Sequence, residues 1–278
     1  MLTACAFAAC GSDEVEPTPT PDPKPELVKM SFLVNAGEET RTVLMHGEGK
    51  EKNQVWFQNG DKIKIFDSYG DGHDFSTTLN NAPSASATFN GYAHKDAEAD
   101  FYALYPYQEK ATFNAASYSI SAILPSQQDA TDGSFDPKAN LSVSCIDLYD
   151  KEQSEIPSFT LYNAGCLVKF TVSMTDLKSV TLTDNSDVPL SGWMAIYVLD
   201  NYCVKKIGGE YPANNSVTLS APENSTLSSG GTYYIAVWPG THSSLTITLT
   251  NSEGKTKTGT LSDVKFNRAK IFNLGTFN

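Results

Sequence analysis

Short stretches in which apolar and polar residues alternate recur along most of this chain, and they limit its fold class more than any other feature. In residues 27–35 the apolar side chains of Val28, Met30, Phe32 and Val34 share one parity. A strand with one buried and one wet face has this period of two. No convincing 3.6-residue periodicity persists over ten residues. The pattern therefore predicts strands rather than helices.

A second stretch, residues 55–66 (V-W-F-Q-N-G-D-K-I-K-I-F), predicts a turn followed by a strand. Asn59, Gly60 and Asp61 are typical turn residues, because Gly tolerates positive φ and the other two can bond nearby backbone. Ile63 and Ile65 then alternate with lysines, which indicates a half-buried strand.

Further strands are expected wherever β-branched or aromatic residues lie between turn residues. These are residues 87–90, 100–105, 117–123, 159–172, 180–183, 193–199, 217–220, 232–238, 245–250, 256–261 and 270–274. Within the long stretch 159–172, Gly165 could mark a bulge. We therefore predict an all-β, antiparallel fold built of β-sandwiches.

The length of 278 residues suits two domains better than one. We expect residues 1–10 to be a signal peptide remnant with a lipobox and residues 11–26 to be a Pro-rich, acidic tether. Residues 27–155 would form an N-terminal β-sandwich, and residues 156–278 a C-terminal β-sandwich.

The charge balance argues against some partners. The formal net charge is −12, and only two of the 20 basic residues are Arg, at positions 41 and 268. A chain without a basic stripe is a poor ligand for nucleic acid and for anionic lipid surfaces. No nucleic-acid partner is therefore expected.

The first ten residues, M-L-T-A-C-A-F-A-A-C, are apolar and small and are followed by polar, acidic chain. They are too short for a membrane helix, which needs about 18–20 apolar residues. They look like the tail of a secretory signal whose charged start is missing, and small residues before a Cys resemble a bacterial lipobox. Cys5 and Cys10 both fit; Cys10 is preferred because hydrated residues follow it. A chance apolar start is the alternative.

No catalytic residue, cofactor or metal site is predicted. The four histidines have no H-x-x-x-H or H-E-x-x-H spacing, which zinc motifs on helices show. The cluster from Asp67 to Asp74 fails as an EF-hand loop, because Tyr69 and Thr78 occupy ligand positions. A solvated loop is expected there. The alternative is a cell-surface glycosidase whose two catalytic carboxylates come from distant strands, because such a pair has no characteristic sequence spacing.

The other cysteines and the aromatic residues are expected in the core. Cys145, Cys166 and Cys203 fit no metal or C-x-x-C pattern, and buried free thiols are expected. A glycan-binding platform could be formed by Trp193, Tyr197, Tyr233, Tyr234 and Trp238. Core packing is the expected role, because Tyr and Trp are common in half-buried strands.

Several motifs in order resemble the fimbrillin family of Bacteroidales, the lipoprotein subunits of pili. They are W-x3-G-D-K-I-x-I-F from Trp56, F-Y-A-L-Y-P at 101–106, L-P-S-Q at 124–127, N-A-G-x-L-V-K-F at 163–170, Y-Y-I-A-V-W-P at 233–239 and F-N-R-A-K-I-F-N-L-G at 266–275. Each motif alone is ordinary strand and turn chemistry. Their order and spacing carry the resemblance, which covers nearly the whole chain after the tether.

The resemblance implies two β-sandwich domains and export as a lipoprotein to the outer membrane and the cell-surface pilus. It also implies an Arg-specific protease that releases the first strand, after which another pilus subunit donates a strand. Here the lipid would be carried by Cys10, and the cut would fall between Arg41 and Thr42. Arg268 should be protected by folding. Candidate donor residues in the last strand are Ile271, Phe272, Leu274 and Phe277.

The predicted function is thus a structural or adhesive pilus subunit, not an enzyme, assembled by protease-triggered strand exchange. A host or bacterial surface receptor is a further candidate partner. The sequence stops soon after residues 270–274. If that strand completes its own domain, the subunit accepts a strand without giving one, which suits a tip or accessory role. The alternative is a non-polymerising, lipid-anchored glycan-binding module.

Overall fold

The computed structural model describes residues 25–37, 57–80, 83–94, 100–148, 156–207 and 212–278. These residues form strands joined by turns, with one short 3-10 turn at Pro137–Ala139. The first ten strands are β1 (Leu27–Ala36), β2 (Lys62–Phe66), β3 (Gly72–Thr77), β4 (Ser86–His94), β5 (Phe101–Tyr105), β6 (Thr112–Asn114), β7 (Ser119–Leu124), β8 (Gln127–Asp129), β9 (Ser142–Ile146) and β10 (Ser158–Asn163). The others are β11 (Cys166–Val172), β12 (Leu177–Asp184), β13 (Ser191–Tyr197), β14 (Cys203–Lys206), β15 (Ala213–Asn214), β16 (Ser216–Ser220), β17 (Thr232–Val237), β18 (Gly240–Asn251), β19 (Thr256–Phe266) and β20 (Ile271–Phe277).

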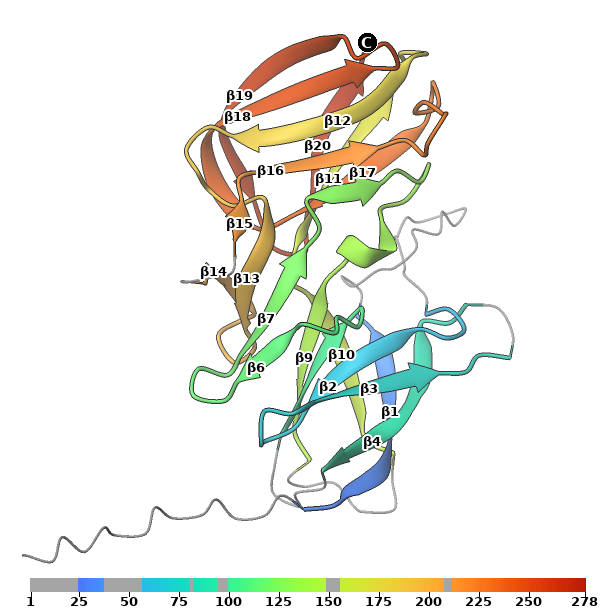
Figure 1. Cartoon of the computed structure of the whole chain (residues 1–278), viewed down its shortest axis with the longest axis vertical. Helices are drawn as coiled ribbons and strands as arrows, with labels where there is room; N and C mark the ends of the chain where they lie inside the picture. The colour runs from blue at the N-terminus through green and yellow to red at the C-terminus, as the bar shows by residue number, and fades with distance from the viewer. Residues whose placement is uncertain (1–24, 38–56, 81–82, 95–99, 149–155, 208–211) are drawn as a thin grey trace, which may run out of the picture.

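Seven strands close into a barrel in the order β1-β10-β9-β5-β2-β3-β4 (Figure 1). Inward-facing side chains fill it, because alternate residues of each strand point to the same side. Phe57, just before β2, packs edge-on against Phe89 of β4 and Tyr105 of β5, with ring centroids 5.3 and 5.5 Å away. Ile63 and Ile65 of β2 are fully buried in this core, as their alternation predicts. Lys64, between them, is buried as well, so the wet face expected for this strand is wrong at that residue.

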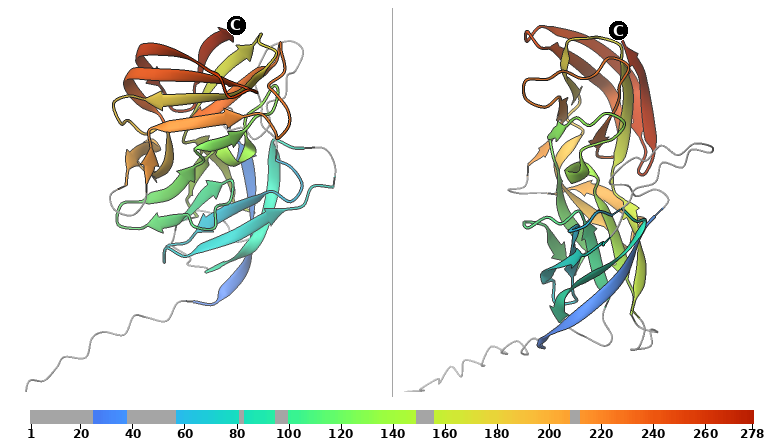
Figure 2. Two further views of the ribbon diagram at one scale, coloured as in Figure 1. Left: turned by 45° about the horizontal axis from the view of Figure 1, so that its top comes forward. Right: turned by 90° about the vertical axis from the view of Figure 1, so that its right-hand side faces the viewer.

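The C-terminal part is a sandwich of two sheets. The order is β17-β11-β20 in one sheet and β19-β18-β12-β16-β8 in the other. Their facing side chains form the largest buried cluster, which includes Phe170, Val180, Leu219 and Leu249. Figure 2 shows the barrel at one end of an elongated molecule and this sandwich at the other.

A further sheet, β14-β13-β7-β6, packs between these two parts. Its core includes Ile120 and Ile196 and reaches Leu104 of the barrel and Trp238 after β17. Trp238 is fully buried, and its indole Nε1 donates a 3.0 Å hydrogen bond to the Gly192 carbonyl. Strand β5 is buried along its whole length, because one face meets the barrel interior and the other this sheet.

The all-β prediction is confirmed, and the structure adds detail that the strand pattern did not contain. The N-terminal sheet closes into a barrel where a β-sandwich was expected. Three strand pairs are parallel in a fold expected to be antiparallel: β1 with β10, β11 with β20, and β16 with β8. Parallel pairs join strands that are distant in sequence, so local alternation cannot reveal them. Strands β3, β6, β8, β9, β14 and β15 were not predicted.

One predicted strand, residues 159–172, was wrong as a single element. It is two strands: β10 belongs to the barrel and β11 to the sandwich. Gly165 lies between them and is not a bulge within one ladder. Ala164, beside it, is fully buried, so the apolar run continues through the point where the chain changes sheets. That continuity explains why the sequence looked like one strand.

The predicted domain boundary between residues 155 and 156 stays a prediction. Strands from both sides of it pair: β1 with β10, β7 with β13 and β8 with β16. The β1–β10 pair lies in the barrel, the β8–β16 pair in the sandwich, and the β7–β13 pair in the intermediate sheet, where β15 also pairs with β13.

The core role predicted for the large aromatics is confirmed for four of them. Trp193, Tyr233, Tyr234 and Trp238 are 9% exposed or less, while Tyr197 is partly exposed. The three described cysteines are free: Cys166 is buried, but Cys145 and Cys203 are partly exposed, so burial of all three was wrong. Among the described residues no helix is long and apolar enough to cross a membrane.

Candidate functional site

The candidate site is β1 and the place in the barrel that it fills. β1 pairs antiparallel with β4 over nine residues, from Leu27 opposite His94 to Asn35 opposite Ser86. On its other edge it pairs parallel with β10 over four residues, beginning with Leu33 opposite Ser158. The two ladders make β1 a bridge that closes the barrel.

The side chains of β1 that point into the barrel are the ones that the sequence places on one parity. Phe32 and Val34 are fully buried, and Val28 and Met30 are partly buried. The Phe32 ring has its centroid 5.4 Å from that of Phe75 and 5.7 Å from that of Phe101. Burying a side chain of this size contributes about 1.5–3 kcal/mol. Phe32 therefore anchors β1.

The predicted processing residues Cys10, Arg41 and Thr42, and also Cys5, lie outside the described residues. The other arginine, Arg268, is described, and its guanidinium makes two contacts within the chain. Arg268 Nη1 donates a 2.7 Å hydrogen bond to the Asn163 carbonyl. Its guanidinium carbon lies 5.4 Å from the centre of the Tyr202 ring. Both contacts hold Arg268 against the body of the protein.

The predicted donor residues Ile271, Phe272, Leu274 and Phe277 all lie in β20, which pairs parallel with β11 in the C-terminal sandwich. Phe272, Leu274 and Phe277 pack against the sandwich core, whereas Ile271 is 41% exposed. Phe277 lies 5.0 Å from Phe170 and Phe272 lies 5.2 Å from Phe266, between ring centroids. β20 thus completes the sandwich of its own chain.

An irregularity at Gly275 explains how three residues of uneven spacing reach one face. The register of β20 against β11 shifts between Lys169 and Thr171, and Gly275 has φ of +83°. One extra residue there reverses the parity of the strand. Phe277 therefore points to the same side as Phe272 and Leu274.

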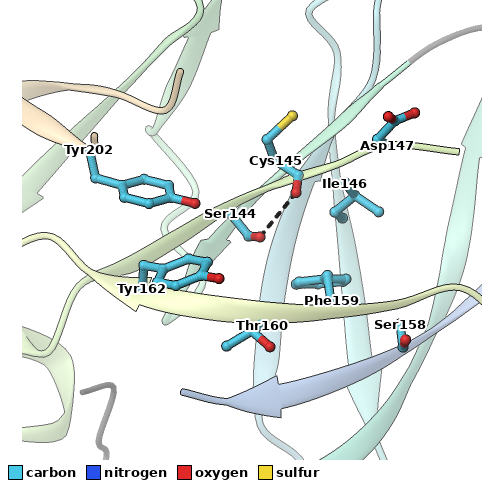
Figure 3. A pocket seen from close by; sticks show the side chains of 9 residues that line it. All are labelled: Ser144, Cys145, Ile146, Asp147, Ser158, Phe159, Thr160, Tyr162 and Tyr202. Atoms are coloured by element: carbon cyan, nitrogen blue, oxygen red, sulfur yellow. Dashed lines mark hydrogen bonds between the residues drawn. The ribbon is translucent and has the colours of Figure 1, made fainter. Parts of the chain in front are cut away.

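A cleft of about 510 Å³ lies beside β10, on the edge opposite to β1 (Figure 3). It exists because β9 and β10 pair only at Tyr162 with Val143 and at Asn163 with Ser142. Beyond these pairs β9 follows β5, and β10 follows β1. Figure 3 shows Tyr162 and Tyr202 at one end of the cleft and Asp147 at the other.

Two titratable groups of the cleft, the Cys145 thiol and the Tyr202 hydroxyl, are held in their neutral forms. Burial, and then the nearby charges of Asp100 and Asp147, raise the pKa of the Cys145 thiol to about 11. Burial, with Tyr162 next in effect, raises the pKa of Tyr202 to about 12. A protonated thiol is a poor nucleophile. The cleft is therefore suited to binding more than to covalent chemistry.

Two features of this region have no local signature in the sequence: the pairing of β1 with β10, and the polar side chains of the cleft. β10 is more than 120 positions from β1, and nothing local marks it as the parallel partner. Ser158 and Thr160 point polar side chains toward the cleft (Figure 3), and the turn-rich segment before them predicts only a loop. Alternation did identify which residues of β1 point inward.

No protein-family model and no curated protein matches the sequence. Solved structures do match. A "putative cell adhesion protein" from Bacteroides uniformis has a TM-score of 0.51 and 14% identity, covering 89% of this chain and 92% of that one. Another, from Bacteroides ovatus, has a TM-score of 0.50 and 11% identity, with the same coverage. The tip fimbrial protein Mfa3 from Porphyromonas gingivalis has a TM-score of 0.41 and 9% identity, over 90% of this chain and 96% of that one.

At identities of 14% and 11%, the first two matches show a likeness of fold alone. They span almost the whole of this chain and of both solved structures, so the likeness of fold extends along the chain and is not limited to one part of it. The fimbrillin resemblance of the motifs predicts neighbours of this kind. This chain has the fold of the Bacteroides structures described as putative cell adhesion proteins.

Proposed function

We propose that this chain is an adhesion-type protein of the bacterial cell surface whose first strand can be exchanged for a strand of another subunit. The observation that carries the proposal is the placement of β1. It closes the barrel through two ladders and the buried side chains of Phe32 and Val34, yet it precedes Arg41 in the sequence. A cut after Arg41 leaves it held by non-covalent contacts alone.

Loss of β1 would uncover two strand edges and an apolar pocket at the same time. β4 would lose nine residue pairs and β10 would lose four. A buried donor or acceptor left without a partner costs about 1–3 kcal/mol, and open strand edges recruit other strands. An extended segment with apolar residues at alternate positions would repair both defects, which is strand addition.

The packing of β20 favours an accepting role over a donating one. Its three inward side chains already fill the sandwich of their own chain. A subunit that accepts but does not donate ends a polymer, so we place the protein at a tip or accessory position of a pilus. Lipid attachment at Cys10 and cleavage by an Arg-specific protease belong to this proposal. Burial of Trp193, Tyr233, Tyr234 and Trp238 argues against the glycan-binding alternative, since only Tyr197 of its five aromatic residues is partly exposed.

The test is to treat the folded chain with an Arg-specific protease and then offer fluorescent peptides. One peptide has the sequence of Leu27–Ala36, a second has the same sequence with Phe32→Asp, and a third has the sequence of Ile271–Phe277. We expect one cut, after Arg41, and binding of the first peptide with displacement of the native fragment. The second peptide should not bind, because its carboxylate would enter the apolar pocket.

Two controls separate cleavage from exchange. The Arg41→Gln chain should stay intact and bind no peptide. Mass spectrometry of the treated wild-type chain should find the bond after Arg268 uncut. The proposal fails if the folded chain resists cutting at Arg41, or if the cut chain retains its own β1 fragment against a large excess of the first peptide. Equal binding of the first and second peptides would also contradict it.

A further inference from the structure

The turn between β2 and β3 brings a buried carboxylate and two imidazoles together. Asp67 follows β2, His73 lies in β3 opposite Ile65, and His94 ends β4. Asp67 Oδ2 lies 2.8 Å from His73 Nε2 and 2.8 Å from His94 Nδ1. The three ligand atoms all lie within 4.8 Å of one another. The expected solvated loop is therefore wrong at Asp67, which is 1% exposed.

We propose that Asp67, His73 and His94 form a binding site for a divalent transition-metal cation, for which zinc is the ion to test. The inference does not depend on strand exchange. It begins with the ligand types. Imidazole nitrogen with one carboxylate suits Zn²⁺ and its neighbours in the first transition row, whereas Ca²⁺ and Mg²⁺ prefer oxygen ligands.

The carboxylate is built to present one oxygen to a cation. Asp67 Oδ1 accepts hydrogen bonds from the backbone N–H groups of Tyr69 at 3.0 Å and of Asp71 at 3.1 Å. The turn is closed by two more backbone bonds between Asp67 and residues 70 and 71. These contacts fix the carboxylate plane and leave Oδ2 directed at the two imidazoles. A buried negative charge is costly unless a positive partner lies beside it.

The spacing requires little movement. Two ligands of a tetrahedral zinc ion, each about 2.0–2.1 Å from the metal, lie about 3.3 Å apart. The present 2.8 Å separations would open by about half an ångström, and the two histidine nitrogens, which lie within 4.8 Å of each other, would take the same spacing of about 3.3 Å. The histidines are 14% and 12% exposed, so a cation can reach them from solvent.

Two neighbouring side chains complete the environment. Asp71 Oδ2 lies 3.7 Å from His94 Nδ1, near enough to supply a fourth ligand by a rotamer change or through water. The Tyr69 ring packs edge-on against His94, with ring centroids 5.5 Å apart, and so limits its orientation. His94 is the last residue of β4, so a bound cation would fasten the β2–β3 turn to the end of that strand. His94 also pairs with Leu27 of β1 in the β4–β1 ladder.

The test is isothermal titration of the whole chain with zinc, with Co²⁺ absorption as a second readout of four-coordinate geometry. We expect one zinc ion per chain and a thermal midpoint that rises with zinc. His73→Gln and His94→Asn each keep a side-chain N–H for Asp67 but remove an imidazole ligand. Each should weaken zinc binding at least about tenfold, and the double variant should lose both the binding and the Co²⁺ bands.

The control variant is His46→Gln, which removes a histidine outside the three-residue cluster and should bind zinc as the wild type does. Circular dichroism checks that the double variant is folded. The proposal is overturned if the wild-type chain binds no zinc, which would leave a purely hydrogen-bonded Asp–His–His group. It is equally overturned if the folded double variant binds zinc as tightly as the wild type.

Discussion

The ring of Phe32 in β1 meets the ring of Phe159 in β10 edge-on, with centroids 5.9 Å apart. This contact lies beside the parallel ladder in which Leu33 faces Ser158 and Val34 faces Phe159. Residues separated by more than 120 positions thus share one seam of the barrel. In the proposed strand exchange β1 would have to break this seam, so we expect its contacts to oppose the release of β1.

The first prediction concerns this seam. Phe32→Ala should lower the free energy of unfolding by about 3–5 kcal/mol, the usual effect of emptying an aromatic core site. Leu33→Ala, one residue further along the same strand, should cost less than about 1 kcal/mol because Leu33 is 36% exposed. Denaturant unfolding of both variants measures the difference. Equal losses would mean that the inward parity of β1 is misassigned.

The second prediction concerns β20. Phe272→Ala should destabilise the chain by about 2–3 kcal/mol, less than a fully buried Phe, because Phe272 is partly buried against Phe266. Ile271→Ala, at an exposed position next to it, should change stability by less than about 1 kcal/mol. If Phe272→Ala has no effect on unfolding, β20 does not complete the sandwich and is available for donation.

The third prediction concerns acid. Asp184 Oδ2 lies 2.8 Å from His242 Nδ1, and both side chains are fully buried. Burial alone would raise the pKa of Asp184, but hydrogen bonds from the backbone N–H groups of Val188 and Ser186 and from His242 outweigh it, and the pKa is lowered. A lowered folded pKa contributes stability above the unfolded value of about 3.9, and this is lost as pH falls through the folded value.

Urea unfolding of the wild type at several pH values should therefore show stability falling steeply below about pH 4. Asp184→Asn should cost about 1.5–3 kcal/mol at neutral pH, because a charged acceptor is lost, and should flatten this decline. The matched control is Asp74→Asn, which removes a carboxylate from the exposed ion pair with Lys62. It should lower the free energy of unfolding by less than about 1 kcal/mol. An unchanged acid decline in Asp184→Asn would contradict the assignment.

The fourth prediction concerns thiol reactivity. Burial raises the pKa of Cys166 to about 12, and burial with Asp100 and Asp147 raises that of Cys145 to about 11. Alkylation of Cys145 should still accelerate about tenfold per pH unit from about pH 8 to about pH 10, since only the thiolate reacts. Cys166 should be modified only on unfolding. Peptide mass spectrometry at each cysteine, with a denatured control, measures both; a Cys145 rate that levels off near pH 9 would contradict the raised pKa.

Alternation in the sequence was sufficient to predict most of the longer strands, and it identified the inward face of β1. Val28, Met30, Phe32 and Val34 lie on the inner side of β1 as their parity requires, because every second side chain of a strand points the same way. Ile63 and Ile65 behave likewise. The pattern failed at residues 159–172, where strand-forming residues lie on both sides of the point at which the chain passes from one sheet into another.

The candidate sites depended on contacts that no local pattern contains. His73 and His94 are 21 positions apart and lack a metal-binding spacing, yet β3 and β4 bring both to Asp67. Likewise, β10 was not recognisable as the partner of β1. Histidine spacing identifies sites on a single helix, and strands that meet side by side in a sheet escape that search.

By itself, then, the sequence determined the fold class, the strand faces and the turn at residues 59–61, because these depend on neighbours within a few positions. Tertiary structure alone decided that β1 closes a barrel against β10, that β20 fills its own sandwich and that Asp67 is buried between two histidines. Those outcomes depend on which strands pair, and pairing is fixed by the burial of whole faces against distant partners. The side chains of one segment cannot specify that choice.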